Sequence, residues 1–426
     1  MKFPRATIVR ALAIGWLGTI GFLTLTSAPD QAARVAETPW SCLACGDAGL
    51  TDVVLNLLLF LPLGLLARAA GWSRGKTVLL LLLLTISIEL TQGNFLAGRD
   101  ASISDVLANT SGGLLGWLIL PATVQSLRPT PAFARRAALG VLALSGLVWF
   151  LTSRGLQVAL SPSAPWVGQL LHLWPGHDRF AGSLQQALLE GVPVPNDPLT
   201  AMPTRFDSLD LLVDVTRADT TVARRPVSML RIVDANQQLQ LSISTRRRDL
   251  LLEHRVVASR WSLRTPTWAF EGAAVIPANT PWRWHWLRRA DRIILQSGPV
   301  SGPVRELMVP VSIGLGWAFI HPFAPAVGAS ATWWTVVWIG LWMALLGWFA
   351  GWVSGRAAIG FGAAAVISMG VASIIATLPL RATELGAAVV VYGCFALLSS
   401  RARYLRRRVA SKSRCRSRAA AAPPSP

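Results

Sequence analysis

Eight apolar stretches of near-spanning length alternate with polar segments along the chain. They occupy residues 8–27, 53–69, 77–90, 103–120, 137–152, 332–353, 357–378 and 385–399. A bilayer core needs about 20 apolar residues per helix, so each stretch predicts a membrane-spanning helix. Residues 77–90 reach that length only if Glu89 and Gln92 belong to the helix. The first stretch has a long apolar run and no clean small-residue cleavage site, which predicts a retained helix rather than a signal peptide.

The region between the two groups of helices follows a different pattern. Short runs rich in Val, Ile and Leu, separated by turn signals such as Asp234-Ala235-Asn236, occupy residues 209–215, 227–233, 237–244 and 249–257. Such spacing predicts an antiparallel β-sandwich. The proline-rich residues 161–203 predict a linker with a short helix at 183–190. Because residues 308–322 contain Pro310 and Pro322, we interpret them as the last strand of this domain or as an interfacial segment.

The whole pattern predicts a mainly α protein: a polytopic helical membrane bundle with an inserted extracytoplasmic antiparallel β-sandwich. The predicted parts are residues 1–155 with five helices, 156–325 with the linker and the sandwich, 326–402 with three helices, and 403–426 as a basic disordered tail. Eight helices would place both termini on the same side of the membrane.

Composition and charge support this class. The chain is 52% hydrophobic and 14% charged, whereas soluble proteins carry about 25% charged residues. Much of the formal net charge of +19 lies in short loops and in residues 401–418. The positive-inside rule therefore predicts a multi-pass protein of the bacterial inner membrane, with cytoplasmic termini and with residues 154–325 outside. This distribution of positive charge, and the lack of a recognised nucleic-acid-binding motif, argue against a nucleic-acid partner.

Seven polar residues interrupt the amino-terminal apolar segments. They are Asp52 with Asn56, Glu89 with Gln92, Arg99, and Asp105 with Asn109. Each pair is spaced to project from one helix face, and the predicted topology places all seven near the outer boundary. Polar residues in such segments suggest a functional site. Arg99 would bind an anion and Glu89 would accept a proton; alternatively, the residues only hold three helices together, with Glu89 paired to Arg99.

Short motifs carry these residues in order along the chain. They read Asp52-Val-Val-Leu-Asn56-Leu-Leu-Leu-Phe60-Leu-Pro62-Leu-Gly64, Glu89-Leu-Thr-Gln92, Gly98-Arg99 and Ser104-Asp105-Val-Leu-Ala-Asn109-Thr-Ser-Gly112-Gly113. Over residues 40–122 the chain resembles the VanZ-like family of integral membrane proteins. The stripe Gly112-x-x-x-Gly116 also matches the family, and small residues at this spacing allow close helix packing.

The resemblance implies a role at the outer membrane surface, since the family name comes from low-level resistance to the lipid-bearing glycopeptide teicoplanin. Our leading hypothesis is binding of a lipid or lipid-linked glycan, in envelope polymer metabolism or antibiotic tolerance, by Asn56, Glu89, Gln92, Arg99, Asp105 and Asn109. One alternative is an enzyme that modifies such a glycan, with Glu89 as base and Arg99 as anion contact. Another is a membrane-anchored glycan-binding scaffold. Residues 227–244 resemble concanavalin/laminin-G sandwiches, which adds polysaccharide as a further partner.

Three smaller signals remain. Cys42 and Cys45 form a C-x-x-C for which a local disulfide, a redox role and free thiols all stay open. Trp282, Trp284 and Trp286 occupy alternate positions along a predicted strand. They could form a stripe in the core, a contact with the membrane interface or a platform for stacking on sugars. The five histidines show no ligand spacing, so neither a metal nor a cofactor is predicted. The sequence assigns no oligomeric state.

Overall fold

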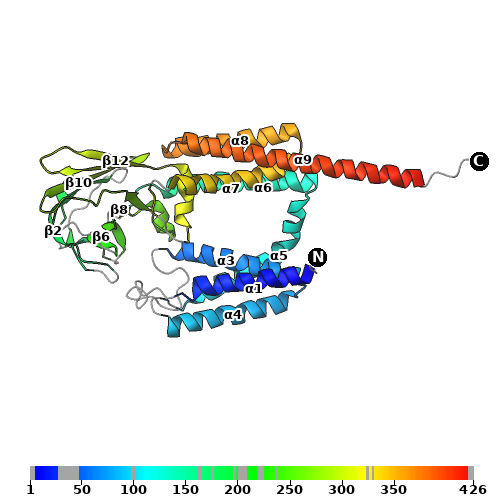
Figure 1. Ribbon diagram of the computed structural model, residues 1–426, viewed down its shortest axis with the longest axis horizontal. Helices are drawn as coiled ribbons and strands as arrows, with labels where there is room; N and C mark the ends of the chain where they lie inside the picture. The colour runs from blue at the N-terminus through cyan, green and yellow to red at the C-terminus, as the bar shows by residue number, and fades with distance from the viewer. Residues whose placement is uncertain are drawn as a thin grey trace, which may run out of the picture. The chain divides into compact units, whose positions relative to one another are not determined.

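Eight helices long and apolar enough to cross a membrane lie in the part of the chain that the computed structural model describes (Figure 1). This part comprises residues 5–26, 48–96, 99, 101–160, 165–173, 177–194, 198–199, 209–218, 225–235, 238–322, 326–328 and 331–420. The helices are α1 (Arg5–Thr24), α3 (Gly49–Ala69), α4 (Arg74–Phe95), α5 (Ile103–Leu127), α6 (Pro131–Gly155), α7 (Ala331–Gly351), α8 (Gly355–Ala376) and α9 (Ala382–Ala420). The predicted set of eight is confirmed.

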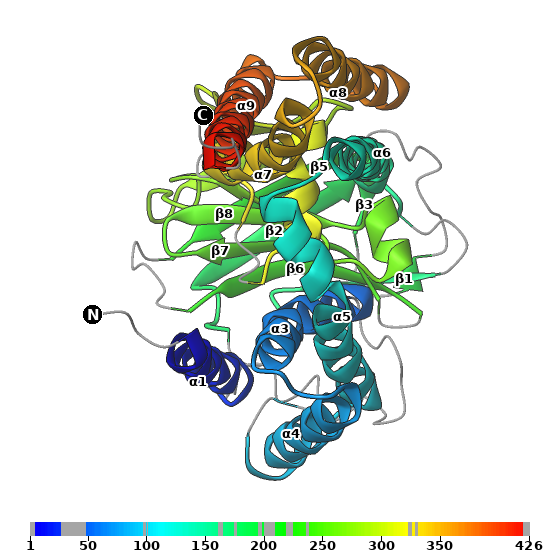
Figure 2. The same ribbon diagram turned by 90° about the vertical axis from the view of Figure 1, so that its right-hand side faces the viewer.

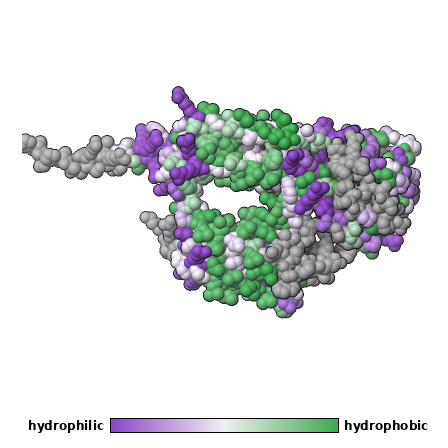
Figure 3. All heavy atoms as spheres, turned by 180° about the vertical axis from the view of Figure 1, so that it is seen from behind, coloured by the Kyte–Doolittle hydropathy of each residue, from purple (hydrophilic) through white to green (hydrophobic). Residues whose placement is uncertain are grey.

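The exposed faces of these helices are apolar. On the face seen in Figure 3, hydrophobic residues cover the helices and hydrophilic residues gather near helix ends. Large side chains such as Phe22, Leu58, Leu83 and Ile359 are more than half exposed. Exposed apolar surface of this extent suits contact with lipid tails rather than with water.

The chain divides into two compact units, each described by itself. Unit 1 contains residues 1–121, 154–311 and 315–332, and unit 2 contains residues 122–153, 312–314 and 333–426. Unit 1 therefore holds α1, α3, α4, most of α5 and all the β-strands, whereas unit 2 holds most of α6 together with α7, α8 and α9. The boundaries expected at residues 155, 325 and 402 follow sequence order and stay predictions.

Glycines bring α3 and α5 of unit 1 into close contact. A Cβ added at Gly64 would lie under 3.0 Å from the backbone of Gly113, and one at Gly116 equally close to that of Leu61. The predicted small-residue stripe thus packs α5 directly on α3. Buried apolar side chains extend the contact to α1 and α4; they are Ile20, Phe60, Leu81 and Ile88.

The described residues of unit 1 also form two six-stranded antiparallel sheets, as predicted. The strands are β1 (Trp166–Leu170), β2 (Gly182–Leu189), β3 (Val192–Pro193), β4 (Pro198–Leu199), β5 (Leu209–Arg217), β6 (Val227–Asp234), β7 (Leu239–Arg246), β8 (Asp249–His254), β9 (Thr267–Phe270), β10 (Pro281–Arg288), β11 (Arg292–Pro299) and β12 (Arg305–Pro310). One sheet has the order β4-β1-β6-β7-β8-β9 and the other β12-β11-β10-β5-β2-β3. Figure 2 shows β6, β7 and β8 side by side.

The core of the sandwich is rich in tryptophan. Trp284 and Trp286 of β10 are buried, as are Trp268 of β9 and Trp166 of β1. Trp284 also donates a hydrogen bond from Nε1 to the Ala273 carbonyl at 3.2 Å. Trp284 and Trp286 therefore belong to a core stripe. Their burial contradicts the alternative that they form a surface platform for stacking on sugars.

The described part of residues 161–203 contains strands where the sequence predicted a linker. β1, β2, β3 and β4 lie in this range, and the helix predicted at residues 183–190 is strand β2, which pairs with β5 and contains a bulge between Leu184 and Gln186. The run Leu-Gln-Gln-Ala-Leu-Leu favours a helix locally, but pairing in the sheet and burial of Ala187 and Leu189 override that propensity.

Two further segments refine the predicted boundaries. Residues 308–322 contain the end of β12 and a 3-10 helix, η3 (Ile313–Phe319), which confirms the strand interpretation for their first part. Helix α9 continues to Ala420, so the basic residues after 403, expected to be disordered, are helical over most of their length. Arginine and alanine are good helix formers, and here they extend a helix already nucleated by the apolar segment.

Candidate functional site

Hydrogen bonds between helices join most of the predicted polar residues. We use the term polar layer for Asn56 of α3, Thr85, Glu89 and Gln92 of α4, Arg99, and Asp105 and Asn109 of α5. Asn56 donates from Nδ2 to Asp105 Oδ1 at 2.6 Å. Both side chains are half-buried, and the glycine contact between α3 and α5 allows this short bond.

The α4 side of the polar layer is more deeply buried. Asn109 donates from Nδ2 to Thr85 Oγ1 at 2.9 Å. Glu89, one turn further along α4, is only 6% exposed. Its Oε2 accepts a hydrogen bond from the backbone N–H of Ser102 at 2.9 Å. The connection that follows α4 is thereby held against the carboxylate, directly before α5 begins.

Two residues of the polar layer bind the carboxyl end of α1. Gln92 donates from Nε2 to the Thr24 carbonyl at 2.8 Å, while Arg99 donates to the carbonyls of Leu23 and Thr26, each at 3.2 Å. The last carbonyls of a helix lack partners within the helix and carry its negative dipole end. Arg99 is therefore positioned by backbone oxygens, which the sequence did not predict as its partners.

The start of α3 is bonded to the sandwich. Thr51 donates to the Phe319 carbonyl at 2.7 Å and accepts from the backbone N–H of Arg264 at 2.9 Å. The backbone N–H of Leu50 donates to the Ser262 carbonyl at 2.9 Å. Asp52 forms an ion pair of 3.7 Å with Arg264. Asp52 thus serves the contact between α3 and the sandwich, and this contact holds the end of α3 that carries Asn56.

Two acceptor atoms in the polar layer have no hydrogen-bond partner among the described residues. They are Gln92 Oε1 and Asn109 Oδ1, both on side chains that are more than nine-tenths buried. Buried polar atoms in folded proteins are nearly always bonded. The Glu89 carboxylate lies on the same face of α4 as Gln92. The polar layer is therefore rich in hydrogen-bond acceptors and suits a ligand that donates hydrogen bonds, such as a hydroxyl-bearing headgroup.

Sequence reasoning missed several of the groups that complete this arrangement. Thr85 was not singled out, although its spacing of four from Glu89 and seven from Gln92 places all three on one helix face. Thr51, Ser102 and the carboxyl end of α1 contribute through backbone or hydroxyl groups, which no pattern of charged residues reveals. Cys42, Cys45 and Gly98 lie outside the described residues.

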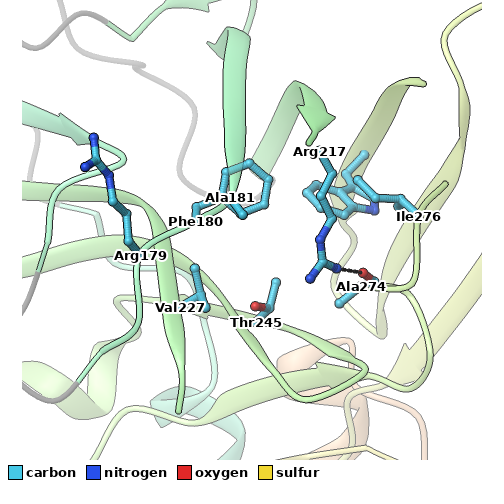
Figure 4. Close-up of a pocket in the computed structure, with 9 residues that line it drawn as sticks. Arg179, Phe180, Ala181, Arg217, Val227, Thr245, Ala274 and Ile276 are labelled. Atoms are coloured by element: carbon cyan, nitrogen blue, oxygen red, sulfur yellow. Dashed lines mark hydrogen bonds between the residues drawn. The ribbon is translucent and has the colours of Figure 1, made fainter. Parts of the chain in front are cut away.

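The sandwich contains a separate small pocket between its two sheets. Figure 4 shows Arg217 of β5, Phe180, Val227 of β6 and Thr245 of β7 around it. Arg217 donates to the Ala274 carbonyl at 3.3 Å, and the buried Trp284 also lines the pocket. The predicted polysaccharide partner and the concanavalin-like assignment of this domain stay predictions.

Fold and site together define a multi-pass membrane protein whose polar layer adjoins a β-sandwich. Residues 16–124 match the family model described as VanZ/LLP1, so this segment is VanZ-like, as the motifs indicated. The match begins within α1, which agrees with the bonds that α1 makes to Gln92 and Arg99. A search of curated proteins and a search of solved structures found no match.

Proposed function

We propose that this VanZ-like protein binds a lipid or lipid-linked glycan in its polar layer, at the outer leaflet of the bacterial inner membrane. The binding residues in this proposal are Asn56, Glu89, Gln92, Arg99, Asp105 and Asn109. The observation that carries it is the pair of buried acceptors, Gln92 Oε1 and Asn109 Oδ1, which have no partner among the described residues. Sugar and glycerol hydroxyls are donors that would satisfy them.

The charged residues of the polar layer support the same ligand class. Arg99 uses Nε and one Nη for the α1 carbonyls, and the other N–H groups of its planar fork suit a phosphate. Glu89 adds a carboxylate to the polar layer, and carboxylate oxygens accept hydrogen bonds from hydroxyl groups. A headgroup with both phosphate and hydroxyls uses both ends of this arrangement.

The orientation in the membrane follows from the positive-inside rule rather than from the fold alone. Arg68 lies in the last turn of α3, and Arg74 and Lys76 lie in the first turn of α4. These cations are at the end of the two helices away from Asn56 and Glu89. A cytoplasmic location for these cations places the polar layer at the outer side. There a lipid-linked glycan of envelope synthesis would reach it, which connects the proposal with the resistance after which the family is named.

Binding of a fluorescent polyprenyl-phosphate-linked glycan to the full-length protein in detergent micelles tests this function. We expect Glu89→Gln and Arg99→Ala each to weaken binding by about tenfold or more, since each removes a charge-assisted hydrogen bond. Glu306→Gln and Arg246→Ala are matched controls on exposed sandwich positions and should bind as the wild type does.

Additional ligands identify which part of the probe is recognised. Polyprenyl phosphate without sugar and the free glycan each contain one half of the probe. If both Glu89→Gln and Arg99→Ala bound the complete probe with unchanged affinity while remaining monodisperse, the polar layer would be structural only. Chemical conversion of the probe, lost in Glu89→Gln, would instead assign Glu89 the role of a base.

A further inference from the structure

A cluster of cations and tryptophans occupies the opposite end of α3 and α4 from the polar layer, together with a tryptophan of α5. It consists of Arg68, Trp72, Arg74, Lys76 and Trp117, which we call the basic–aromatic cluster. No Asp or Glu occurs in residues 53–88 or 106–177, so the sequence around the cluster carries positive charge alone.

The cluster is ordered by specific contacts. The Arg68 guanidinium lies 4.2 Å from the centre of the Trp117 ring and donates to the Trp117 carbonyl at 3.0 Å. Trp117 in turn donates from Nε1 to the Trp72 carbonyl at 3.0 Å. Lys76 Nζ lies 5.0 Å from the centre of the Trp72 ring. Cation–π contacts of this kind hold both charges over indole faces.

The turn between α3 and α4 fixes this arrangement. Gly71 has a φ of +82°, a conformation that glycine adopts without strain and that commonly ends helices. Ser73 caps α4 by accepting from the backbone N–H of Lys76 at 3.4 Å. Arg74 and Lys76 are exposed in the first turn of α4. Their charges therefore face outward at the positive end of the α4 dipole.

We propose that the basic–aromatic cluster binds the phosphate headgroup of an anionic glycerophospholipid. Tryptophan side chains favour the headgroup level of a bilayer, and the cluster lies where two membrane-length helices end, so a lipid phosphate is the anion that it meets. A zwitterionic headgroup brings its own cation against Arg68, Arg74 and Lys76. Charge complementarity therefore selects an anionic lipid.

Lipid retention by the purified full-length protein tests this proposal. Protein in detergent is mixed with equal amounts of phosphatidylglycerol and phosphatidylcholine, and the retained lipids are quantified by mass spectrometry. We expect enrichment of phosphatidylglycerol by about fivefold or more, the effect of one cation near an anionic surface. The triple variant Arg68→Gln, Arg74→Gln, Lys76→Gln should bring the ratio close to that of the mixture.

Two controls separate a site from general charge. The triple variant Arg246→Gln, Arg247→Gln, Arg248→Gln removes the same charge from an exposed turn of the sandwich and should keep the enrichment. Lys76→Gln alone changes only an exposed side chain, so it tests the proposal even if the triple variant fails to fold. This variant should lower the enrichment of phosphatidylglycerol measurably.

Three results would overturn the proposal. The first is a wild-type ratio equal to that of the mixture. The second is an equal loss of enrichment in the two triple variants. The third is complete displacement of phosphatidylglycerol by excess glycerol phosphate, because the cluster would then be a site for a soluble phosphate rather than for a lipid.

Discussion

At the scale of single residues, a neutral histidine lies beside a buried cation in the sandwich. His254 is fully buried and stacks on Trp268 with ring centres 6.1 Å apart. Burial, with the nearby Arg288 charge as the second cause, lowers the pKa of His254 to about 3. Burial also lowers the pKa of Arg288 to about 10, so this arginine stays charged at neutral pH. It donates to the Leu156 carbonyl at 3.3 Å and anchors the chain where it enters the sandwich.

This pair predicts that the sandwich loses stability in mild acid. Below pH 6.5 the unfolded chain binds a proton at His254, whereas the folded chain does so only near pH 3. The free energy of unfolding should therefore fall by about 1.4 kcal/mol per pH unit between these values. Thermal unfolding of His254→Gln from pH 7 to 5 should show a weaker pH dependence than the wild type. His172→Gln, at an exposed position, is the control, and equal slopes for wild type and His254→Gln would contradict the argument.

Also at the scale of single residues, only part of the polar layer could be predicted from the sequence. Asn56, Glu89, Gln92, Asp105 and Asn109 stood out because amides and carboxylates are costly in apolar segments. Most of their partners did not stand out, because they are backbone groups such as the Thr24 carbonyl and the Ser102 N–H. Nearly every residue has such groups, and only the fold determines which of them become partners. The sequence therefore identified every residue of the polar layer except Thr85, but only part of its hydrogen-bond network.

At the scale of elements, close helix contact depends on glycine. We expect Gly116→Ala to lower the free energy of unfolding by about 2 kcal/mol, since its Cβ would meet the Leu61 backbone under 3.0 Å away. Gly140→Ala, which meets nothing within 4 Å, should be neutral or slightly stabilising. Unfolding of both variants in detergent measures the difference. Equal stability would show that α3 and α5 do not depend on this contact.

Helices were predictable as elements and the early strands were not. A long apolar run predicts each spanning helix, and tertiary contacts do not change the secondary structure of such a run. Strand β2 depends on β5, a partner more than twenty residues later in the chain, and its own residues favour a helix. In the same way, α9 extends to Ala420 through a stretch with little apolar character, where the sequence predicted disorder.

At the scale of the whole molecule, the two units must be considered separately. Within unit 1, the bonds from Thr51 and Asp52 to the sandwich attach this domain directly to the helix that carries Asn56. The polar layer is thereby bounded by the carboxyl end of α1 and by a folded domain. Sequence order predicted the sandwich and the helices as separate parts, but not that this contact would join them.

Photo-crosslinking tests the central claim, ligand binding at the polar layer, most directly. A photoreactive residue at Phe95, which is 81% exposed at the end of α4, is compared with one at Ile374 of α8, which is 78% exposed. With the lipid-linked glycan probe, we predict labelling at Phe95 that unlabelled probe displaces and that Glu89→Gln abolishes, with only background labelling at Ile374. Equal labelling at both positions, unaffected by Glu89→Gln, would contradict the account.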